Sequence, residues 1–313
     1  MEQRNLGPSG LQVSVVGLGC NNFGMRIDLE GSRAVVHKAL DLGITLFDTA
    51  DTYGNKGGSE TILGEILGNR RKDIVLATKF GMPMDPDRGL VGASRRYIMR
   101  AVEDSLRRLK TDCIDLYQLH RADPHTPIEE TLRALDDLVR DGKVRYIGCS
   151  NLPAWQVADA QWTARYLNLN RFISCQDEYS LLVRDHERHL IPAMQHYGLS
   201  LLPYFPLASG MLTGKYKRDQ APPPDTRFAV MTQRAGEYLT EENFAIVDRL
   251  TEFAEARGHT LLDLAFSWLV CQPVVASVIA GATKPEQVAE NVQAATWKLT
   301  PDEIAEVNQI SAK

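Results

Sequence analysis

Short apolar runs rich in β-branched residues alternate along this chain with amphipathic segments of roughly 10 to 15 residues. The amphipathic segments keep the helical period, as Leu132, Leu135 and Leu138 do before the helix-terminating Gly142. The apolar runs have the length of buried strands and comprise residues 15–20, 44–48, 74–79, 114–120, 144–150, 172–176, 199–204 and 274–280. The pattern therefore predicts eight strands joined by helices.

Strands joined by helical crossovers form parallel sheets that are covered on both faces. Eight repeats favour closure into a (β/α)8 TIM barrel of the α/β class, and we expect residues 1–313 to form one such domain. An open doubly wound sheet is the alternative, but Asn22 stands where its GxGxxG fingerprint needs the third glycine. A P-loop is also disfavoured, because Ser209 replaces the first glycine and Tyr216 follows the lysine in SGMLTGKY.

Three segments fall outside the regular repeat. The opening stretch RNLGPSGLQVS has the pattern of a short β-hairpin that could plug the bottom of the barrel. Residues 207–236, which include prolines 222–224, are too long for an ordinary strand-to-helix connection. We interpret them as a lid or cofactor clasp, and the alternative is a disordered surface insertion. Two helical segments, 241–257 and 260–271, precede the last strand where one would suffice.

Composition narrows the classes of function. The net charge of −5 argues against nucleic-acid binding driven by bulk electrostatics. No apolar run reaches the roughly 18 residues of a membrane-spanning helix, and the N-terminus lacks the apolar core of a signal peptide. Five cysteines without a CxxC pair fit reduced thiols, so we expect a cytoplasmic protein. We expect no metal site, because HxH and HExxH pairs are missing. No long apolar face stands out that would predict an oligomer.

Polar side chains end nearly every predicted strand. Asp48, Lys79 and His120 close three consecutive strands, and Tyr53 stands on the loop just beyond Asp48. Active sites of (β/α)8 barrels lie at the carboxyl ends of the strands, so these four side chains should converge at one mouth. The remaining strand ends carry Ser150, Asn151, Gln176, Tyr204, Gly281 and Thr283.

The four converging side chains have a coherent chemistry. A lysine cation favours the phenolate, so Lys79 is expected to lower the pKa of Tyr53 from its ordinary value of about 10. Asp48 would hold the ammonium group and His120 would orient a carbonyl oxygen, which makes Tyr53 a general acid. Such a site needs a hydride carrier, because none of its side chains is a reductant. Asp51 receives no catalytic role and is expected to be a loop residue.

Other catalytic classes fit the sequence less well. A Schiff-base role for Lys79 is possible, since barrel enzymes use lysine in this way, but it leaves Tyr53 and His120 without a role. The chain has no GxSxG elbow, which disfavours an α/β-hydrolase.

A set of ordered motifs spans essentially the whole chain, namely GLGCNNFG, FDTADTYG, GGSETILGEIL, LATKFG, SLRRLKTDCIDLYQLHRAD, GKVRYIGCSN, CQDEYSLL, YFPLASGMLTGKY and VIAGATKPEQVAEN. Through these motifs the chain resembles the aldo-keto reductase superfamily, in particular the bacterial branch that also resembles potassium-channel β subunits. The resemblance implies a (β/α)8 barrel that reduces carbonyl compounds with a nicotinamide cofactor.

The resemblance also implies residue roles. Asp48, Tyr53, Lys79 and His120 match the family's catalytic tetrad, with Tyr53 as acid in reduction and as phenolate base in oxidation. The positions that match cofactor-binding residues are Ser150, Asn151 and Gln176 at the nicotinamide carboxamide, Tyr204 stacked on the ring, Pro206, Leu207 and Ser209 along the pyrophosphate, Lys215 and Arg227 in the clasp, and Gly281, Thr283, Lys284, Gln287, Glu290 and Asn291 at the adenosine and 2′-phosphate end.

Some positions depart from the family pattern. Gln287 stands where many relatives have the arginine that grips the 2′-phosphate, so Lys215, Arg227 and Lys284 would have to supply the charge. We therefore expect NADPH, with NADH as the alternative. Asp177 replaces an asparagine that is common after the glutamine, and we expect this change to be tolerated.

The predicted function is that of a cytoplasmic NADP(H)-dependent oxidoreductase that reduces aldehydes or ketones to alcohols. The alternative is a cofactor-binding redox sensor or regulatory subunit with little turnover, because the channel β subunits use the fold in that way. The partner is then a small carbonyl compound, with no nucleic acid or membrane involved. Phe23 and Phe80 are expected in an apolar wall of the substrate site.

Overall fold

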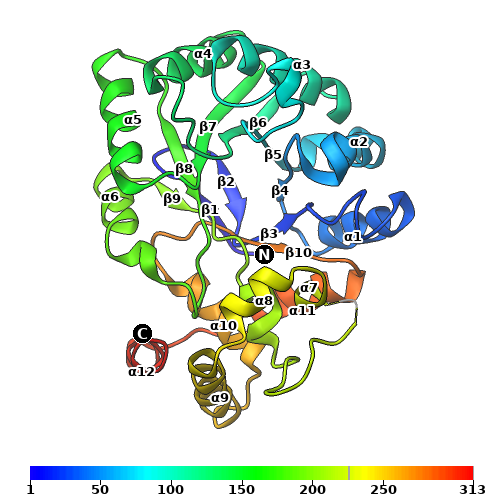
Figure 1. Ribbon diagram of the computed structural model, residues 1–313, viewed down its shortest axis with the longest axis vertical. Helices are drawn as coiled ribbons and strands as arrows, with labels where there is room; N and C mark the ends of the chain where they lie inside the picture. Colours follow the sequence, from blue (N-terminus) through cyan, green and yellow to red (C-terminus); the bar gives the residue numbers. More distant parts are fainter. Residues whose placement is uncertain (225, 313) are drawn as a thin grey trace.

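The computed structural model describes residues 1–224 and 226–312 and contains a barrel of parallel strands surrounded by helices (Figure 1). The strands pair in the order β10-β3-β4-β5-β6-β7-β8-β9, and the pairing is parallel throughout. Their bounds are β3 (Val16–Gly19), β4 (Leu46–Asp48), β5 (Val75–Phe80), β6 (Ile114–Leu119), β7 (Val144–Ser150), β8 (Phe172–Gln176), β9 (Ser200–Leu201) and β10 (Val278–Gly281).

Hydrogen bonds between the last strands close the sheet on itself. The amide of Leu201 donates to the carbonyl of Val274 at 2.7 Å, and the amide of Ile279 donates to the carbonyl of Pro203 at 2.9 Å. The prediction of a closed (β/α)8 barrel is therefore confirmed. Every residue of β5 and β6 is buried, as expected for strands with helices on one face and the barrel interior on the other.

Helices follow the strands as the hydrophobic period predicted. The helix α3, for example, begins where the Ser94 hydroxyl accepts the amide of Tyr97 and ends at Lys110, which adopts a left-handed conformation. The helices are α1 (Leu29–Asp41), α2 (Tyr53–Leu67), α3 (Arg95–Leu109), α4 (Ile128–Arg140), α5 (Ala154–Tyr166), α6 (Leu190–Tyr197), α7 (Arg227–Val230), α8 (Thr232–Tyr238), α9 (Glu241–Glu255), α10 (Leu261–Cys271), α11 (Pro285–Ala294) and α12 (Pro301–Ile310), with short 3-10 turns η1 (Gly68–Asp73), η2 (Pro86–Arg88), η3 (Asp185–Glu187) and η4 (Ala208–Thr213).

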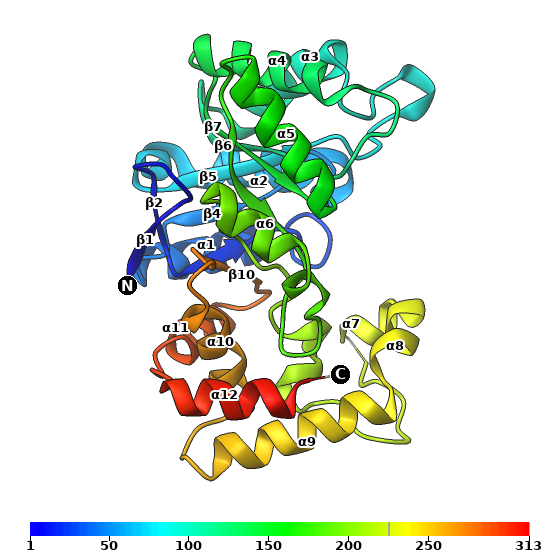
Figure 2. The same ribbon diagram turned by 90° about the vertical axis from the view of Figure 1, so that its left-hand side faces the viewer.

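The N-terminal hairpin plugs the amino-terminal end of the barrel, as predicted. Its strands β1 (Gln3–Asn5) and β2 (Gln12–Ser14) pair antiparallel, and Figure 2 shows them at one end of the sheet. Leu6 and Val13 are fully buried in a separate core cluster with side chains from the barrel interior, including Leu46, Leu116 and Ala276. The hairpin does not cover the opposite end of the barrel, where the strands terminate.

The long segment after β9 is folded against the barrel rather than loose on its surface. Tyr216 and Phe228 are buried, with their ring centroids 4.7 Å apart, and α8 packs beside them. Within the expected range 207–236, residue 225 lies outside the described residues. The two extra helical segments predicted before the last strand are α9 and α10. No helix in the described ranges is long and apolar enough to cross a membrane.

Candidate active site

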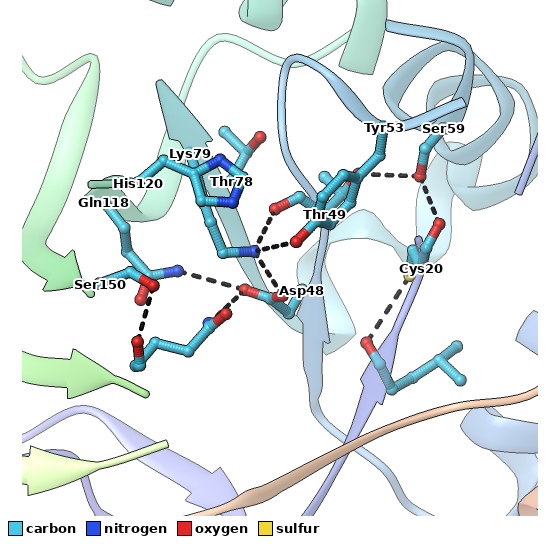
Figure 3. A network of polar contacts seen from close by, with 12 residues as sticks. Cys20, Asp48, Thr49, Tyr53, Ser59, Thr78, Lys79, Gln118, His120 and Ser150 are labelled. Atoms are coloured by element: carbon cyan, nitrogen blue, oxygen red, sulfur yellow. Dashed lines mark hydrogen bonds and ion pairs between the residues drawn. The ribbon is translucent and has the colours of Figure 1, made fainter. Parts of the chain in front are cut away.

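The carboxyl ends of three neighbouring strands bring the first candidates together. Asp48 is the last residue of β4, Lys79 lies in β5, and His120 directly follows β6. Parallel pairing aligns Asp48 with Ala77 and Lys79 with Gln118, so the side chains reach the same rim. Tyr53, the first residue of α2, lies beside Lys79 with its hydroxyl directed toward the Lys79 ammonium group (Figure 3).

Lys79 is the centre of this group. Its Nζ atom lies 2.6 Å from Asp48 Oδ2 and 2.8 Å from the carbonyl oxygen of Thr49, and donates to Tyr53 Oη at 3.5 Å (Figure 3). The lysine side chain is fully buried. Burial, the largest single influence, disfavours the charge of Lys79, but the combined effects of Asp48 and Tyr53 exceed it, so the pKa of Lys79 is raised above its ordinary value. The ammonium group therefore stays charged beside the phenol.

The second oxygen of Asp48 is also occupied. Gln118 Nε2 donates to Asp48 Oδ1 at 3.2 Å, and Gln176 Nε2 donates to the same oxygen at 2.8 Å. The sequence interpretation missed Gln118, although an amide inside the apolar run IDLYQLH was a visible signal. Gln176 lines the cavity as expected, but the structure commits its amide nitrogen to Asp48. Both glutamines thus fix the carboxylate that holds Lys79.

Tyr53 is held by an unusual backbone turn. Gly54, Asn55, Lys56 and Gly57 all have positive φ angles, between 62° and 107°. A Cβ atom at Gly54 would lie 2.3 Å from the amide nitrogen of Ser59, so only glycine fits there. The turn directs the Tyr53 ring back over the barrel mouth, where the Lys79 ammonium lies 4.8 Å from the ring centroid.

Electrostatics at Tyr53 differ from the expectation. Burial raises the pKa of Tyr53 above its ordinary value, and the opposing effect of Lys79 is smaller, so the net shift is upward rather than downward. The hydroxyl therefore carries its proton at neutral pH, which suits a proton donor. Lys79 would act on the phenolate as it forms.

His120 is a neutral ring at the same mouth. Burial, followed by repulsion from Lys79 and Arg121, lowers the pKa of His120 to about 3. Its ring is T-shaped to that of Tyr53, with centroids 5.7 Å apart. His120 Nδ1 is buried and has no hydrogen-bond partner among the described residues. A neutral imidazole keeps one N–H, and because His120 lines the cavity the ring can donate this N–H to an oxygen bound there.

A cavity of about 1400 Å³ extends from these residues across the barrel mouth. Asp48, Tyr53 and His120 line one end, whereas Lys79 lies behind Tyr53 and does not reach the surface of the cavity. All fifteen residues expected to contact the cofactor line it, namely Ser150, Asn151, Gln176, Tyr204, Pro206, Leu207, Ser209, Lys215, Arg227, Gly281, Thr283, Lys284, Gln287, Glu290 and Asn291.

Phe23 and Phe80 do not belong to this cavity, which corrects the expectation for the substrate wall. Both side chains are fully buried in the main hydrophobic core. The Phe80 ring packs against that of Tyr117, with centroids 4.8 Å apart and planes tilted by 30°, and both belong to the main core between the strands and the helices rather than to the mouth. Aromatic residues at strand ends do not by themselves reveal which face they occupy.

Asn151 joins several parts of the mouth. Its Nδ2 atom donates to the carbonyl of His120 at 3.2 Å and to Ser150 Oγ at 2.8 Å, and its Oδ1 accepts from Tyr204 Oη at 2.8 Å. The Asn151 amide nitrogen donates to Asp177 Oδ1 at 3.1 Å, which supports a left-handed backbone with φ of 57°. The residues expected at a nicotinamide are thus tied to one another before any ligand binds.

The other end of the cavity is strongly cationic. Burial is the main cause that lowers the pKa of Lys215, and repulsion from Arg26 and Arg227 lowers it further. The pKa of Arg227 is lowered by burial and then by repulsion from Arg26 and Arg234. Lowered pKa values of this kind indicate positive charges that an anion would relieve. Arg26, in the loop after β3, was not among the predicted site residues.

The start of α11 adds a second anion-binding feature. Gln287 Oε1 accepts from Thr283 N at 2.8 Å and from Thr283 Oγ1 at 3.2 Å, which orders the turn before the helix. Among the described residues no side chain caps the first amides of α11, so these amides remain donors toward the cavity end lined by Lys284. Together with the cations, these donors fit a phosphorylated dinucleotide. Within residues 1–224 and 226–312, no cluster of three His, Cys, Asp or Glu is arranged to hold a metal.

A latch joins the clasp to the barrel. On α8, Arg234 pairs with Glu178, and its Nε donates to Ser209 Oγ at 2.9 Å, while Tyr238 Oη donates to Glu178 at 2.5 Å. The guanidinium groups of Arg227 and Arg234 lie 4.5 Å and 4.4 Å from the ring centroid of Phe205. Ser209 and Arg227 are predicted from the sequence, but Glu178, Arg234 and Tyr238, which also hold the clasp against the barrel, are not.

Comparison with known proteins agrees with this geometry. The sequence model of the Aldo/keto reductase family matches residues 15–312. The chain is 37% identical to a probable voltage-gated potassium channel subunit beta of Arabidopsis thaliana, over 99% of this chain and 96% of the relative. It is 36% identical to the versiconal hemiacetal acetate reductase of Aspergillus parasiticus, over 97% and 95%. It is 35% identical to the L-glyceraldehyde 3-phosphate reductase of Escherichia coli K12, over 99% and 92%.

Proposed function

Because the chain belongs to the aldo/keto reductase family, we propose that it is an NADP(H)-dependent oxidoreductase that reduces aldehydes or ketones to alcohols. One observation carries the proposal. A buried, charged Lys79 lies between Asp48 and the hydroxyl of Tyr53, at the end of a cavity whose far end is cationic. Two relatives whose names describe reductases, from Aspergillus parasiticus and Escherichia coli, support this reading.

In the proposed reaction a bound NADPH supplies the hydride to the carbonyl carbon. Tyr53 donates the hydroxyl proton to the carbonyl oxygen, which becomes the alcohol oxygen. Lys79 stabilises the phenolate as it develops, and Asp48 keeps the ammonium group in position. Neutral His120, which lines the cavity, orients the carbonyl oxygen by donating a ring N–H to it.

The preference for NADPH over NADH rests on charge. Lys215 and Arg227 have lowered pKa values because they are buried near other cations, and Lys284 stands at the start of α11. A 2′-phosphate would offset this repulsion and also meet the free amides of the helix. The side-chain oxygen of Gln287 accepts a hydrogen bond from Thr283, so Gln287 orders the turn before α11 but adds no positive charge.

The test is consumption of NADPH with a panel of small aldehydes and ketones. In Tyr53→Phe we expect kcat to fall by at least about 100-fold, because the proton donor is lost, while the Kd for NADPH changes less than about twofold. Tyr166→Phe, on the exposed face of α5, is the matched control and should retain full turnover. Near-normal turnover by Tyr53→Phe would refute Tyr53 as the acid.

A second candidate is a cofactor-binding sensor or regulatory subunit with little turnover. It is favoured by the relative in Arabidopsis thaliana whose name describes a channel subunit rather than a reductase. Tight NADPH binding without turnover of any carbonyl in the panel would favour this candidate. Turnover that depends on Tyr53 would favour the reductase.

A further inference from the structure

One buried carboxyl group at the barrel mouth has no part in the mechanism described above. Asp177 directly follows β8 and is only 2% exposed. Its Oδ1 accepts the amide of Asn151 at 3.1 Å, and this is its one side-chain hydrogen bond among the described residues. No cation in the described ranges forms an ion pair with it. An acidic group enclosed in this way is costly to ionise unless a positive charge arrives.

The groups around Asp177 do not provide that charge. On its own strand lies the neutral thiol of Cys175, and beyond β9 lies the protonated phenol of Tyr204. Two cations at the barrel mouth are already engaged with other carboxylates, since Lys79 pairs with Asp48 and Arg234 pairs with Glu178. Burial accordingly raises the pKa of Asp177 to about 7, which leaves it poised between its two states near neutral pH.

The position of Asp177 relates it to the nicotinamide end of the cavity. It supports Asn151 from behind, and Asn151 in turn contacts His120, Ser150 and Tyr204 at the cavity surface. The oxidised nicotinamide ring carries a positive charge and the reduced ring does not. A carboxylate enclosed in protein behind the residues that line this end of the cavity acts on a charge bound there more strongly than it would in water.

We propose that the buried carboxyl of Asp177 discriminates between the two redox states of the cofactor, because as a carboxylate it favours the positively charged oxidised nicotinamide. In its protonated form Asp177 carries no charge and does not favour the binding of either redox state of the cofactor. Binding of NADP⁺ then releases the Asp177 proton to solvent, whereas binding of NADPH does not. This inference rests on the proposed function, and it assigns to Asp177 a role in setting product affinity.

The experiment measures the Kd values of NADP⁺ and NADPH by calorimetry between about pH 5.5 and 8.5. Both cofactors carry the same 2′-phosphate, so its titration cancels in the ratio of the two Kd values. In the unmodified protein we expect Kd(NADP⁺)/Kd(NADPH) to fall about tenfold as pH rises through the titration of Asp177. In Asp177→Asn, which keeps an oxygen acceptor for Asn151, the ratio should be independent of pH.

The matched control is Asp51→Asn. Asp51 is also buried and burial also raises its pKa to about 7, but its side chain contacts Tyr97 of α3 and does not line the cavity. This variant should keep the pH-dependent ratio, and so should Tyr53→Phe, because the Tyr53 hydroxyl does not titrate in this range. A ratio that becomes flat in either control, or that stays pH-dependent in Asp177→Asn, overturns the role of Asp177.

A second measurement needs no variant. Calorimetry at pH 7 in two buffers of different ionisation enthalpy should show more proton release for NADP⁺ than for NADPH. Equal release for the two cofactors overturns the inference even if Asp177→Asn does not fold. Binding of both cofactors with a flat ratio removes the inference and leaves the proposed function standing. Failure of both cofactors to bind removes the proposed function and the inference together.

Discussion

Among single residues, Asp51 is the clearest case of a carboxyl group whose burial lowers the stability of the folded protein when the group is ionised. Tyr97 Oη donates to Asp51 Oδ2 at 3.1 Å, but Asp51 Oδ1 is buried without a partner among the described residues. Burial, together with repulsion from nearby Glu60, raises the pKa of Asp51 to about 7. Glu60 itself is paired with Arg108 at 2.7 Å. The sequence correctly predicts that Asp51 lies in a loop, but it does not predict that the side chain is buried.

The first residue-scale prediction concerns Asp51→Asn and the pH dependence of stability. The unfolded carboxyl titrates near 3.8 and the folded one near 7, so the folded state binds more protons between these values. Stability of the unmodified protein therefore falls as pH rises through this window, and the penalty is complete above pH 7. Asp51→Asn should raise the free energy of unfolding at pH 8 by roughly 2–4 kcal/mol and by little at pH 4.

Urea unfolding of both proteins at pH 4, 6 and 8 measures the difference. An equal change in the free energy of unfolding at every pH would contradict the assignment of a titrating carboxyl at this position. Asp73→Asn is a suitable control, because Asp73 forms an exposed ion pair with Arg70 and should show no comparable gain at pH 8.

Residue placement could be predicted where strand position alone decides it. Asp48, Lys79 and His120 end consecutive parallel strands, and this suffices to bring them to one rim. It does not suffice for Phe80, whose face of the strand depends on register and pleat, or for Arg234, whose contact with Glu178 spans 56 residues. Likewise, the net pKa of Tyr53 depends on how deeply the fold buries it, which spacing does not reveal.

At the scale of elements, the clasp is held by few groups. Arg234 on α8 contacts Ser209, Glu178, Tyr238 and the ring of Phe205. Ala208 and Ser209 in η4 both have positive φ angles, of 46° and 57°, so the turn is held in a conformation that side-chain-bearing residues seldom adopt. The clasp was predicted from its length and prolines, but its latch was not, because the latch depends on how α8 packs on the barrel.

We predict that Arg234→Ala loosens the clasp. The change leaves Glu178 without its cation and frees η4, so the dissociation rate of NADPH should rise about tenfold with little change in the association rate. Stopped-flow displacement of bound NADPH measures both rates. Arg218→Ala is the matched control, since Arg218 forms exposed ion pairs with Glu241 and Asp248 and should leave the rate unchanged. An equal rise in both variants would show that the latch is not specific.

At the scale of the whole molecule, one end of the barrel holds the cavity and the other end is closed by the hairpin. The cavity occupies the carboxyl end, and the hairpin with its own core cluster fills the amino end. The sequence predicted this division because eight apolar runs and one isolated hairpin pattern were visible in order. The regular part of β9 is shorter than the predicted 199–204, but the chain keeps hydrogen bonds to its neighbours beyond Leu201, from the amide of Leu202 to the carbonyl of Cys175 and from the amide of Tyr204 to the carbonyl of Asp177.

Separation of the two ends predicts that stability and activity can be changed independently. Leu6→Ala should lower the free energy of unfolding by about 3 kcal/mol, because it opens a cavity in the floor of the barrel. The Kd for NADPH measured on the folded protein should not change. Val91→Ala, at a 38% exposed position, is the control and should cost less than about 0.5 kcal/mol. A marked loss of NADPH affinity in Leu6→Ala would show that the two ends are coupled.

The hairpin has a consequence for the order in which the protein folds during synthesis. Arg4 Nη1 donates to the carbonyl oxygens of Val270 and Val275 at 2.8 Å and 2.9 Å, across sequence separations of 266 and 271 residues. Leu6 and Val13 likewise pack against Ile173, Leu202 and Ala276, which leave the ribosome much later. Contacts of such long range form slowly. The segment translated first can therefore complete its contacts only when nearly all of the barrel has been made.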